Sequence, residues 1–478
     1  MELVTIPYSR LDVGNELARA YLVEPERVLP LFGADYRDPR TFEPKETPRA
    51  PFGLVEYNRA VGGSVENAER IERGVACVIS GQQAGLLYGP AYTTYKFLTV
   101  INLARTLGEE LKAPVVPVFW VESEDHDWAE VNRFFLDGRR LALDVAVEPG
   151  TPVSGIEADP SAFLEEVRSH LGDGEAWSRV EPDRNVARWH VKNLARLVPD
   201  SGVVFVEPHL LRDAARDVAG RIAAAPDVLD ASLGIETGFE KALQPPRGAY
   251  LFDSSGPRRR LERGAALPDK WSGDVASRVL IQNAVFQPLA AVCGPGEIHY
   301  WAQLKQAHEA LDIPMPVVFP RDTATLVEPG ASRNAAKLGL ALDDIVCGET
   351  VLPHPDADDP IAERLRRLAG EAQSLIAAVE DGSLDLPADA SKPFKRTVGR
   401  LEADLDRLAS RVDAARAEAE GVGRKRYDKL LTMLRPRDRL QERTSSLFPY
   451  LVRHGPDLAV RLMEAFDPYE FGHYLVML

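Results

Sequence analysis

The stretch VISGQQAGLLYGPAYTTYK, residues 78–96, decides the fold class of this chain. Its first residues are apolar or small, which is typical of a buried strand, and its second half has the apolar spacing of a helix. Between these halves lie two glutamines, Gln82 and Gln83, flanked by Gly81 and Gly85. A buried strand, a glycine-containing turn and a helix together predict one half of a βαβ unit.

The sequence around this stretch repeats the same alternation. The run VVPVFWV at 115–121 is rich in β-branched and aromatic residues, and the helical segment AEVNRFF follows the polar residues after it. Such continuous apolar runs suit strands that are buried on both faces of a sheet. The pattern therefore predicts an α/β fold with a parallel sheet. Strands are predicted at residues 75–80, 115–121, 203–208 and 315–321, a further unit of apolar run, turn and helix at 285–307, and a helix at about 92–107.

The composition is that of an ordinary globular protein and disfavours several functional classes. The chain has 478 residues, 45% hydrophobic and 27% charged, so we expect about two to four domains rather than disorder. The net charge of −16 disfavours binding to nucleic-acid phosphates. Three widely spaced cysteines offer no disulfide framework, no apolar stretch approaches the ~20 residues of a membrane helix, and no signal peptide is evident. These features predict a cytoplasmic protein with no nucleic-acid or membrane partner.

Beyond residue 355 the spacing of the apolar residues changes. Over residues 361–379, and again over 398–422, they recur at alternating intervals of four and three, which is the heptad pattern of coiled coils. A polar stretch between the two runs can turn the chain, so the sequence predicts two long antiparallel helices. The alternative is two helices packed flat on the core.

These patterns divide the chain into a core, a helical domain and a returning tail. The core begins with an irregular lead-in that contains some helix, over residues 1–70, and contains a hairpin-like or loop element at 247–264. The expected boundaries are 1–355 for the core, with inserted segments at about 150–202 and 225–282, 356–435 for the coiled-coil domain, and 436–478 for a C-terminal segment that packs back on the core.

The turn between the first predicted strand and its helix is the first candidate site. Ligands of α/β folds bind at the carboxyl ends of parallel strands, where helix N-termini offer unpaired N–H groups. The two glycines would let the backbone approach a ligand, and the two glutamine amides can donate and accept hydrogen bonds without charge. Tyr92 and Lys96 lie on one face of the following helix, where Lys96 could reach a phosphate or carboxylate. The alternatives are an ordinary glycine turn and a solvated lysine.

A run of titratable residues follows the second predicted strand. In extended geometry Glu124 and His126 would point to one side, and Asp125 and Asp127 to the other. Such groups can form a general acid–base pair or bind a metal ion, and histidine titrates near neutral pH. The alternative is an acidic turn that caps the next helix.

The segment CGPGEIHYWAQLK, residues 293–305, repeats the strand–turn–helix geometry of the opening stretch. Gly294 and Gly296 form a tight turn, Glu297 stands in the first helical turn, and Tyr300 and Gln303 follow on the helix. Two such turns at neighbouring strands would converge on one cleft.

A basic run at residues 258–260, Arg258, Arg259 and Arg260, is the last feature that could bind a ligand. A basic run is usually a solvated surface. If the segment folds over the cleft, it could contact a carboxylate or phosphate of a substrate.

Several of these segments resemble a known family. The stretches SGQQAGLLYGPAYTTYK, PVFWVESEDHDWAEVN, GPGEIHYWAQLK with IPMPVVFPR, and LQERTSSLFPYLVRHGPDL are similar to characteristic stretches of the bacillithiol biosynthesis cysteine-adding enzyme family. The resemblance extends over essentially the whole chain. It implies a Rossmann-like core with inserted connecting segments, similar in layout to class I aminoacyl-tRNA synthetases and nucleotidylyltransferases. It also implies an antiparallel coiled coil used to form a homodimer.

The resemblance further implies a ligase that joins L-cysteine through its carboxyl group to the amine of glucosaminyl-malate, in the last step of bacillithiol synthesis. A free carboxylate and an amine do not condense favourably in water, so ATP, with Mg²⁺, is the expected source of activation. Two alternatives are a metal-dependent hydrolase that uses Glu124 and His126, and a non-catalytic coiled-coil scaffold.

The resemblance and the turns together predict the site residues. No residue is predicted to be a metal ligand. The catalytic residues, which would bind the substrate ammonium or accept its proton, are predicted to be Glu124, Asp125, His126 and Asp127. Substrate or nucleotide binding is predicted for Gly81, Gln82, Gln83, Gly85, Tyr92, Lys96, Gly294, Gly296, Glu297, Tyr300, Gln303 and Arg321.

Overall fold

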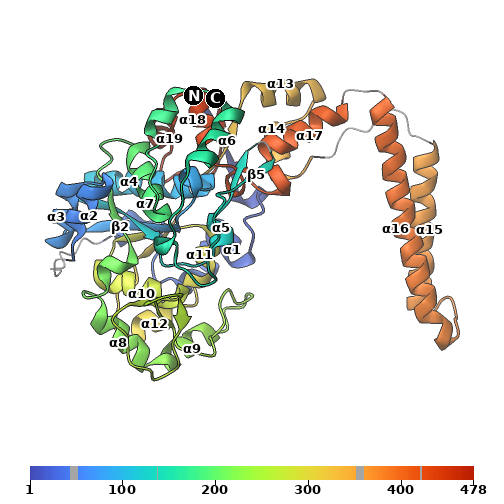
Figure 1. Cartoon of the computed structure of the whole chain (residues 1–478). Coiled ribbons are helices and arrows are strands. Elements are labelled where there is room, and N and C mark those ends of the chain that lie inside the picture. The colour runs from blue at the N-terminus through green and yellow to red at the C-terminus, as the bar shows by residue number, and fades with distance from the viewer. Residues whose placement is uncertain (43–51, 137, 351–359, 420–422) are drawn as a thin grey trace. The chain divides into compact units, whose positions relative to one another are not determined.

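The computed structural model describes residues 1–42, 52–136, 138–350, 360–419 and 423–478 of the chain. Its contacts divide the chain into two units (Figure 1). The first unit comprises Met1–Val327 together with Arg439–Leu478, and the second comprises Glu328–Asp438.

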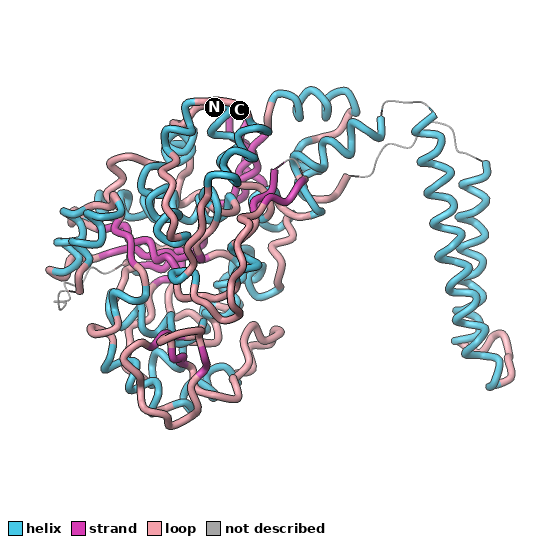
Figure 2. Tube along the Cα trace, in the orientation of Figure 1, coloured by secondary structure: helices cyan, strands magenta, loops and turns pink. Residues whose placement is uncertain are grey.

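A five-stranded parallel sheet forms the centre of the first unit (Figure 2). The chain builds this sheet outward from β2 through β3 to β6, and then adds β10 and β11 on the other side of β2. This is the doubly wound order of a Rossmann-like fold, in which the direction of winding reverses between β2 and β10. The predicted α/β class with a Rossmann-like parallel sheet is confirmed. In their order across the sheet the strands are β11 (Val317–Pro320), β10 (Ala290–Cys293), β2 (Cys77–Gln83), β3 (Val116–Glu122) and β6 (Val204–Val206).

Apolar strands and a long helix make the core around this sheet. All seven residues of β3 are buried, as expected for a strand covered on both faces. Helix α4 (Ala91–Leu111) packs on β2 and β3, where the ring of Phe97 lies 5.5 Å from Phe119 and 6.0 Å from Phe205. Burying each such ring stabilises the fold by about 1.5–3 kcal/mol. The helix ends at Lys112, which takes the left-handed conformation of a C-cap.

Helices lie on both sides of the sheet in this unit (Figure 1). In the described part of the chain, no helix is both long enough and apolar enough to cross a bilayer. Besides α4 they are α1 (Glu16–Val23), α2 (Leu54–Val61), α3 (Val65–Glu72), α5 (Trp128–Val131), α6 (Ser161–Leu171), α7 (Val186–Leu197), α8 (Arg216–Ala224), α9 (Pro226–Gly234), α10 (Val275–Phe286), α11 (Pro295–Trp301), α12 (Lys305–Ala310), α18 (Phe448–His454) and α19 (Leu458–Ala465).

A second, three-stranded sheet joins the two ends of the chain. Strand β13 (Gly472–Met477) lies between β1 (Glu2–Pro7), to which it is antiparallel, and β12 (Thr323–Val327), to which it is parallel. The marked chain ends lie side by side in Figure 1. The prediction of an irregular lead-in is therefore wrong for residues 2–7. Their hydrogen-bonding partner is 470 residues away, and local sequence carries no signal for it.

Two small antiparallel elements occur in the connections between the main strands. One is the hairpin of β4 (Phe134–Leu136) and β5 (Arg139–Leu141). The other is a sheet in which β7 (Leu251–Asp253) lies between β8 (Arg259–Arg260) and β9 (Trp271–Gly273). The predicted hairpin within residues 247–264 is confirmed by the β7–β8 pair.

The second unit contains the predicted pair of long helices. Helices α15 (Pro360–Glu380) and α16 (Ala388–Ala419) pack along each other, and the ion pairs Arg366–Asp413 and Glu380–Lys395 show that they are antiparallel. The antiparallel coiled coil is confirmed, although residues 420–422 of the predicted heptad run lie outside the described residues. The unit also contains α13 (Pro329–Leu338), α14 (Leu342–Cys347) and α17 (Gly423–Leu434).

Candidate active site

A cavity of about 460 Å³ lies at the carboxyl ends of β2 and β10. This is the point at which the winding of the sheet reverses, and open α/β sheets bind their ligands there because the two following connections diverge. The cavity lies between the ends of β2 and β3 on one side and the start of α11 on the other. The small β7–β9 sheet and the start of α10 also line it, and Arg321 and Arg443 reach it from later in the chain. Its lining is Gly81, Gln82, Gln83, Tyr92, Lys96, Glu122, Asp125, Phe252, Arg258, Arg260, Gly273, Asp274, Val275, Arg278, Gly294, Pro295, Gly296, Glu297, Tyr300, Arg321 and Arg443.

The two glutamines belong to the strand and not to the turn. Strand β2 continues to Gln83, which pairs with Glu122 of β3, so the predicted strand end at residue 80 is three residues short. Both amides line the cavity, and each fixes another polar side chain there. Gln82 accepts a hydrogen bond of 2.8 Å from Lys96, and Gln83 donates a short one to Asp125.

The two glycines beside them meet different spatial limits. A Cβ atom on Gly81 would lie 3.1 Å from Trp120, and one on Gly85 would lie 2.8 Å from the Cα of Gly89. Gly85 is therefore required by close packing of the backbone. It does not line the cavity, and its carbonyl oxygen lies 2.9 Å from Nδ1 of the buried His190.

Lys96 connects the two strand-end turns. Its buried ammonium donates to the Gly81 carbonyl at 2.9 Å and to Gln82 at 2.8 Å, and forms an ion pair with Glu297. Three partners use all three N–H groups of an ammonium. Burial lowers the pKa of Lys96, and the Glu297 carboxylate opposes that shift. The structure thus places Lys96 at the cavity but commits its hydrogen bonds to the protein.

The side chains of the acidic run after β3 lie in different surroundings. The strand ends at Glu122 and the chain turns at once, so the extended geometry predicted for residues 124–127 is wrong. Glu124 is buried outside the cavity and pairs with Arg212. Asp127 caps α5 by accepting from the Glu130 amide at 3.0 Å.

Asp125 is the member of the predicted catalytic run that lines the cavity. Burial opposes its ionisation, but the hydrogen bonds from Gln83 and the His126 amide and the charge of Arg258 together hold its pKa below the usual range. His126 lies beside it without lining the cavity. Its Nδ1 is 3.7 Å from the Asp125 carboxylate, and 42% of its side chain is exposed.

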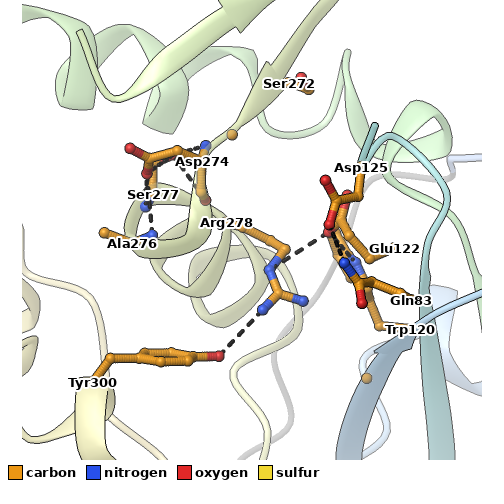
Figure 3. Close-up of polar contacts among 12 residues, drawn as sticks. Gln83, Trp120, Glu122, Asp125, Ser272, Asp274, Ala276, Ser277, Arg278 and Tyr300 are labelled. Atoms are coloured by element: carbon orange, nitrogen blue, oxygen red, sulfur yellow. Dashed lines mark hydrogen bonds and ion pairs between the residues drawn. The ribbon is translucent and has the colours of Figure 1, made fainter. Parts of the chain in front are cut away.

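Glu122, Arg278 and Tyr300 form a polar network across the cavity (Figure 3). Arg278 lies 3.5 Å from the Glu122 carboxylate and donates to the Tyr300 hydroxyl at 3.3 Å. The indole of Trp120 also donates to Glu122, at 2.9 Å. Burial raises the pKa of Glu122, although the nearby arginines oppose the shift, and burial also raises the pKa of Tyr300.

The start of α11 forms the other wall of the cavity. Glu297 accepts from the Gly294 amide at 2.7 Å, which closes the first helical turn. Of the residues predicted here to bind substrate, Gly294, Gly296 and Tyr300 line the cavity. Gln303, which was also predicted, does not line it. Gln303 is buried and hydrogen-bonds Leu243 and Leu233, so it holds the chain segment next to α9.

Several lining residues carried little or no signal in the sequence. The basic run was noted as a possible ligand contact, and Arg258 and Arg260 do line the cavity, with guanidinium carbons 4.0 and 4.4 Å from the Phe252 ring centroid. Arg278 stands inside the apolar helix α10, where no glycine turn marks it. Further lining residues outside the predicted set are Glu122, Gly273, Asp274, Val275, Pro295 and Arg443.

Among the described residues, no group of three or more His, Cys, Asp or Glu side chains gathers as it would around a metal ion. In particular, Glu124 and His126, the pair on which the hydrolase alternative depends, have separate surroundings. Glu124 is 2% exposed beside Arg212, whereas the His126 side chain is 42% exposed beside Asp125.

Two family models match the chain and together cover most of it. The N-terminal Rossmann-like domain of the bacillithiol biosynthesis protein BshC matches residues 1–216 and 260–322. The C-terminal coiled-coil domain of BshC matches residues 324–478.

Relatives similar to this chain over nearly their whole lengths carry the name "Putative cysteine ligase BshC". The protein of Symbiobacterium thermophilum is 29% identical, and the match covers 97% of each chain. That of Anoxybacillus flavithermus is 27% identical over 89% of this chain and 90% of its own. That of Carboxydothermus hydrogenoformans is 27% identical over 98% of this chain and 99% of its own.

Proposed function

The chain belongs to the BshC family of bacillithiol biosynthesis, and on that premise we propose that it is a ligase that joins L-cysteine to glucosaminyl-malate. The bond formed is an amide between the cysteine carboxyl group and the amine of the glucosamine. The single observation that carries the proposal is the open cavity, lined by charged side chains, at the point where the sheet reverses its winding, formed by the stretches that resemble the family.

The charge of the cavity suits small anionic substrates. Six cationic side chains line it against four carboxylates, so its lining carries a net positive charge in a chain whose net charge is −16. Guanidinium groups pair well with carboxylates and phosphates, the charged groups of malate and of ATP. The volume of about 460 Å³ is that of a small-molecule site.

The carboxylates of the cavity suit the amine chemistry. An ammonium group needs an ionised partner, and the low pKa of Asp125 keeps that carboxylate charged at neutral pH. The attacking amine must also lose a proton, which a group with a pKa nearer neutrality accepts more readily. Glu122, whose pKa is raised by burial, fits that second role. Activation of the cysteine carboxylate is proposed to use ATP with Mg²⁺, because direct condensation is unfavourable in water.

The two alternative functions receive less support from the geometry. A metal-dependent hydrolase needs Glu124 and His126 at one ion, and their side chains lie in different surroundings. A non-catalytic scaffold predicts no cleft behind residues 81–96, and the cavity lies there.

Mass spectrometry of a complete reaction tests the proposal. Purified protein is incubated with glucosaminyl-malate, cysteine, ATP and Mg²⁺, and the thiol product is sought by its mass. We expect product in the complete mixture and none when ATP is omitted. Product without ATP would exclude the proposed activation, and no product in either mixture would exclude the proposed reaction.

Matched Asp→Asn variants test the assignment of Asp125. Asp125→Asn removes the negative charge of this one carboxylate from the cavity. It should lower kcat/KM by about 100-fold, within the range that general acid–base catalysis contributes. Asp127→Asn makes the same change at the cap of α5, where asparagine caps equally well, and should change kcat/KM by less than about 3-fold. Equal losses in both variants would contradict the assignment.

We also propose that the protein is a cytoplasmic homodimer that associates through α15 and α16. All three cysteines, Cys77, Cys293 and Cys347, are buried and form no disulfide, which suits a reducing compartment. Among the described residues of the helix pair the buried positions are alanines, and five larger apolar residues are exposed at heptad spacing. A second copy would cover them. The exposed residues are Ile361, Leu368, Leu375, Leu401 and Leu408.

A further inference from the structure

One cationic side chain of the cavity differs from the other five in having no carboxylate partner. Among the residues that the structure describes, no hydrogen bond or ion pair of the Arg443 guanidinium is present, and the side chain still lines the cavity. The other five are each neutralised by a carboxylate of the protein. Those pairs are Lys96–Glu297, Arg258–Asp125 at 3.8 Å, Arg260–Asp274 at 2.9 Å, Arg278–Glu122 at 3.5 Å and Arg321–Glu442 at 2.5 Å.

The backbone that carries Arg443 is fixed on its N-terminal side. Gln441 forms two hydrogen bonds with the backbone of Leu326 in β12, at 2.9 and 3.0 Å. Glu442 is buried and binds Arg321 through both carboxylate oxygens, at 3.0 and 2.5 Å. These bonds hold the short helix Gln441–Arg443 against the core.

The chain is also fixed on the C-terminal side of Arg443. The Ser445 carbonyl accepts from the Ala91 amide at 2.7 Å, and the Ser446 hydroxyl donates to the Leu87 carbonyl at 2.8 Å. Arg443 therefore presents a free guanidinium from a rigid support, which lowers the entropy cost of binding a ligand.

We propose that Arg443 binds a carboxylate or phosphate group of a substrate, an assignment that rests on the proposed ligase reaction and names the residue that receives its anionic substrate. The five paired cations cancel the charge of five carboxylates, so Arg443 supplies the unbalanced positive charge of the cavity. The Arg443 side chain is still exposed to solvent, and partial desolvation together with the neighbouring charge of Arg321 lowers its pKa. A bound anion would relieve the repulsion between these two guanidinium groups.

Two anionic groups of the proposed reaction share this chemistry, the malate carboxylates and the ATP phosphates. Both accept two parallel hydrogen bonds from one guanidinium. Steady-state kinetics separates the two sources, because each substrate can be varied with the other saturating.

The test compares Arg443→Gln with Arg443→Lys and with the control Arg439→Gln. Arg439 is exposed, lies in the same segment and does not line the cavity, so its variant makes the same change of charge outside the site. Arg443→Gln should raise one KM by about 10- to 100-fold, the cost of a lost charge-assisted hydrogen-bond pair. The KM of Arg443→Lys should lie between those of the wild type and Arg443→Gln, because lysine keeps the positive charge but lacks the two parallel N–H groups of a guanidinium. Arg439→Gln should change neither KM.

The outcome assigns the anion or rejects the inference. A rise confined to the KM for glucosaminyl-malate identifies the carboxylate, and a rise confined to the KM for ATP identifies the phosphate. Unchanged KM values in Arg443→Gln, with an active wild type, would overturn the inference while leaving the ligase proposal intact.

If the wild type makes no product, titration calorimetry with L-malate alone and with ATP alone still tests whether Arg443 binds an anion. Binding of either anion by the wild type and by Arg439→Gln, with at least about 10-fold weaker binding by Arg443→Gln, supports Arg443 as an anion site even though the proposed reaction has failed. Equal binding by all three proteins, or none by the wild type, overturns the inference.

Discussion

The parallel-sheet core and the α15–α16 pair bury opposite kinds of side chain. The core encloses its largest rings, such as Trp120 and Tyr95, and also encloses charged groups such as Lys96 and Glu442. Among its described residues the helix pair buries only alanines, half-buries some larger apolar side chains such as Leu365 and Leu405, and leaves a stripe of others and most of its charges in water. Its buried residues include Ala362, Ala369, Ala372 and Ala409.

This difference indicates where each unit is sensitive to change. In the core, charges meet at low dielectric, where an ion pair or an unpaired group has a large effect on both stability and chemistry. On the helix pair, ion pairs such as Lys395–Glu380 are exposed and contribute little, and the apolar surface is the feature that needs a partner.

The largest expected effect is that of Lys96→Met. The change leaves the Glu297 carboxylate without its cation, and breaking a buried ion pair costs about 3–5 kcal/mol. It also separates the two turns at the cavity, so ligase activity should fall by at least about 100-fold. Urea unfolding measures the first effect and product mass the second.

Two variants test the cause of that loss. Lys96→Met combined with Glu297→Gln removes the unpaired charge, so it should regain part of the lost stability without regaining activity. Lys270→Met, on the surface of the core, should change the unfolding free energy by less than about 0.5 kcal/mol. A fully stable Lys96→Met single variant would show that the pair does not hold the turns together.

The next effect is the dependence of core stability on pH. Burial lowers the pKa of His190, His308 and His473 to about 4 in each case. In the unfolded chain these rings take up protons below about 6.5, whereas in the fold they do so only near 4. Stability is therefore fully present above pH 6.5 and is lost as the pH falls towards 4, by up to about 3 kcal/mol for each ring.

One buried carboxyl group acts in the opposite direction. Burial raises the pKa of Asp322 to about 7, so its contribution is greatest at low pH and decreases as the pH rises from about 4 to 7. Three histidines outweigh one aspartate, and the unfolding free energy should rise from pH 4 to 6.5. In urea unfolding across that range His308→Gln should flatten the slope. His170→Gln, the same change at an exposed position, is the matched control.

The sequence predicts the main sheet because its signals are local. Each strand is a continuous apolar run of about the length at which propensity and burial agree, and the parallel direction of the strands follows from the βαβ connections. The β1–β13 pair could not be predicted in this way. Its two strands stand at opposite ends of the chain, and nothing in the residues 2–7 specifies residues 472–477 as partner.

The same distinction between local signals and tertiary contacts applies to the residues of the candidate site. Glycine turns at strand ends mark backbone positions, so Gly81, Gly294 and Glu297 could be placed at one cavity from sequence. Side-chain direction after a strand depends on the turn that follows, which is why Asp125 reaches the cavity and Glu124 does not. Arg443 enters from the far end of the chain and is placed only by tertiary contacts.

The smallest expected effect on catalysis comes from the exposed stripe of the helix pair. Leu368→Glu combined with Leu408→Glu places charges on side chains that are 42% and 47% exposed in the single chain. If a second copy covers them, these charges would be buried unpaired, and light scattering should show a dimer for the wild type and a monomer for the variant. Activity per chain should stay within about 2-fold, because the cavity is lined by residues of the core alone.

The matched control adds the same charge away from the stripe. Gln373→Glu combined with Ser410→Glu changes exposed positions on the same two helices, each two residues from a leucine of the stripe and so on another face, and should leave the dimer intact. A monomeric wild type would reject the homodimer, and a variant at Leu368 and Leu408 that remains dimeric would place the interface elsewhere. The five exposed apolar side chains gain no stability from burial in an isolated helix pair. A second copy that covers the stripe would bury them, and this gain is what the charges at positions 368 and 408 would remove.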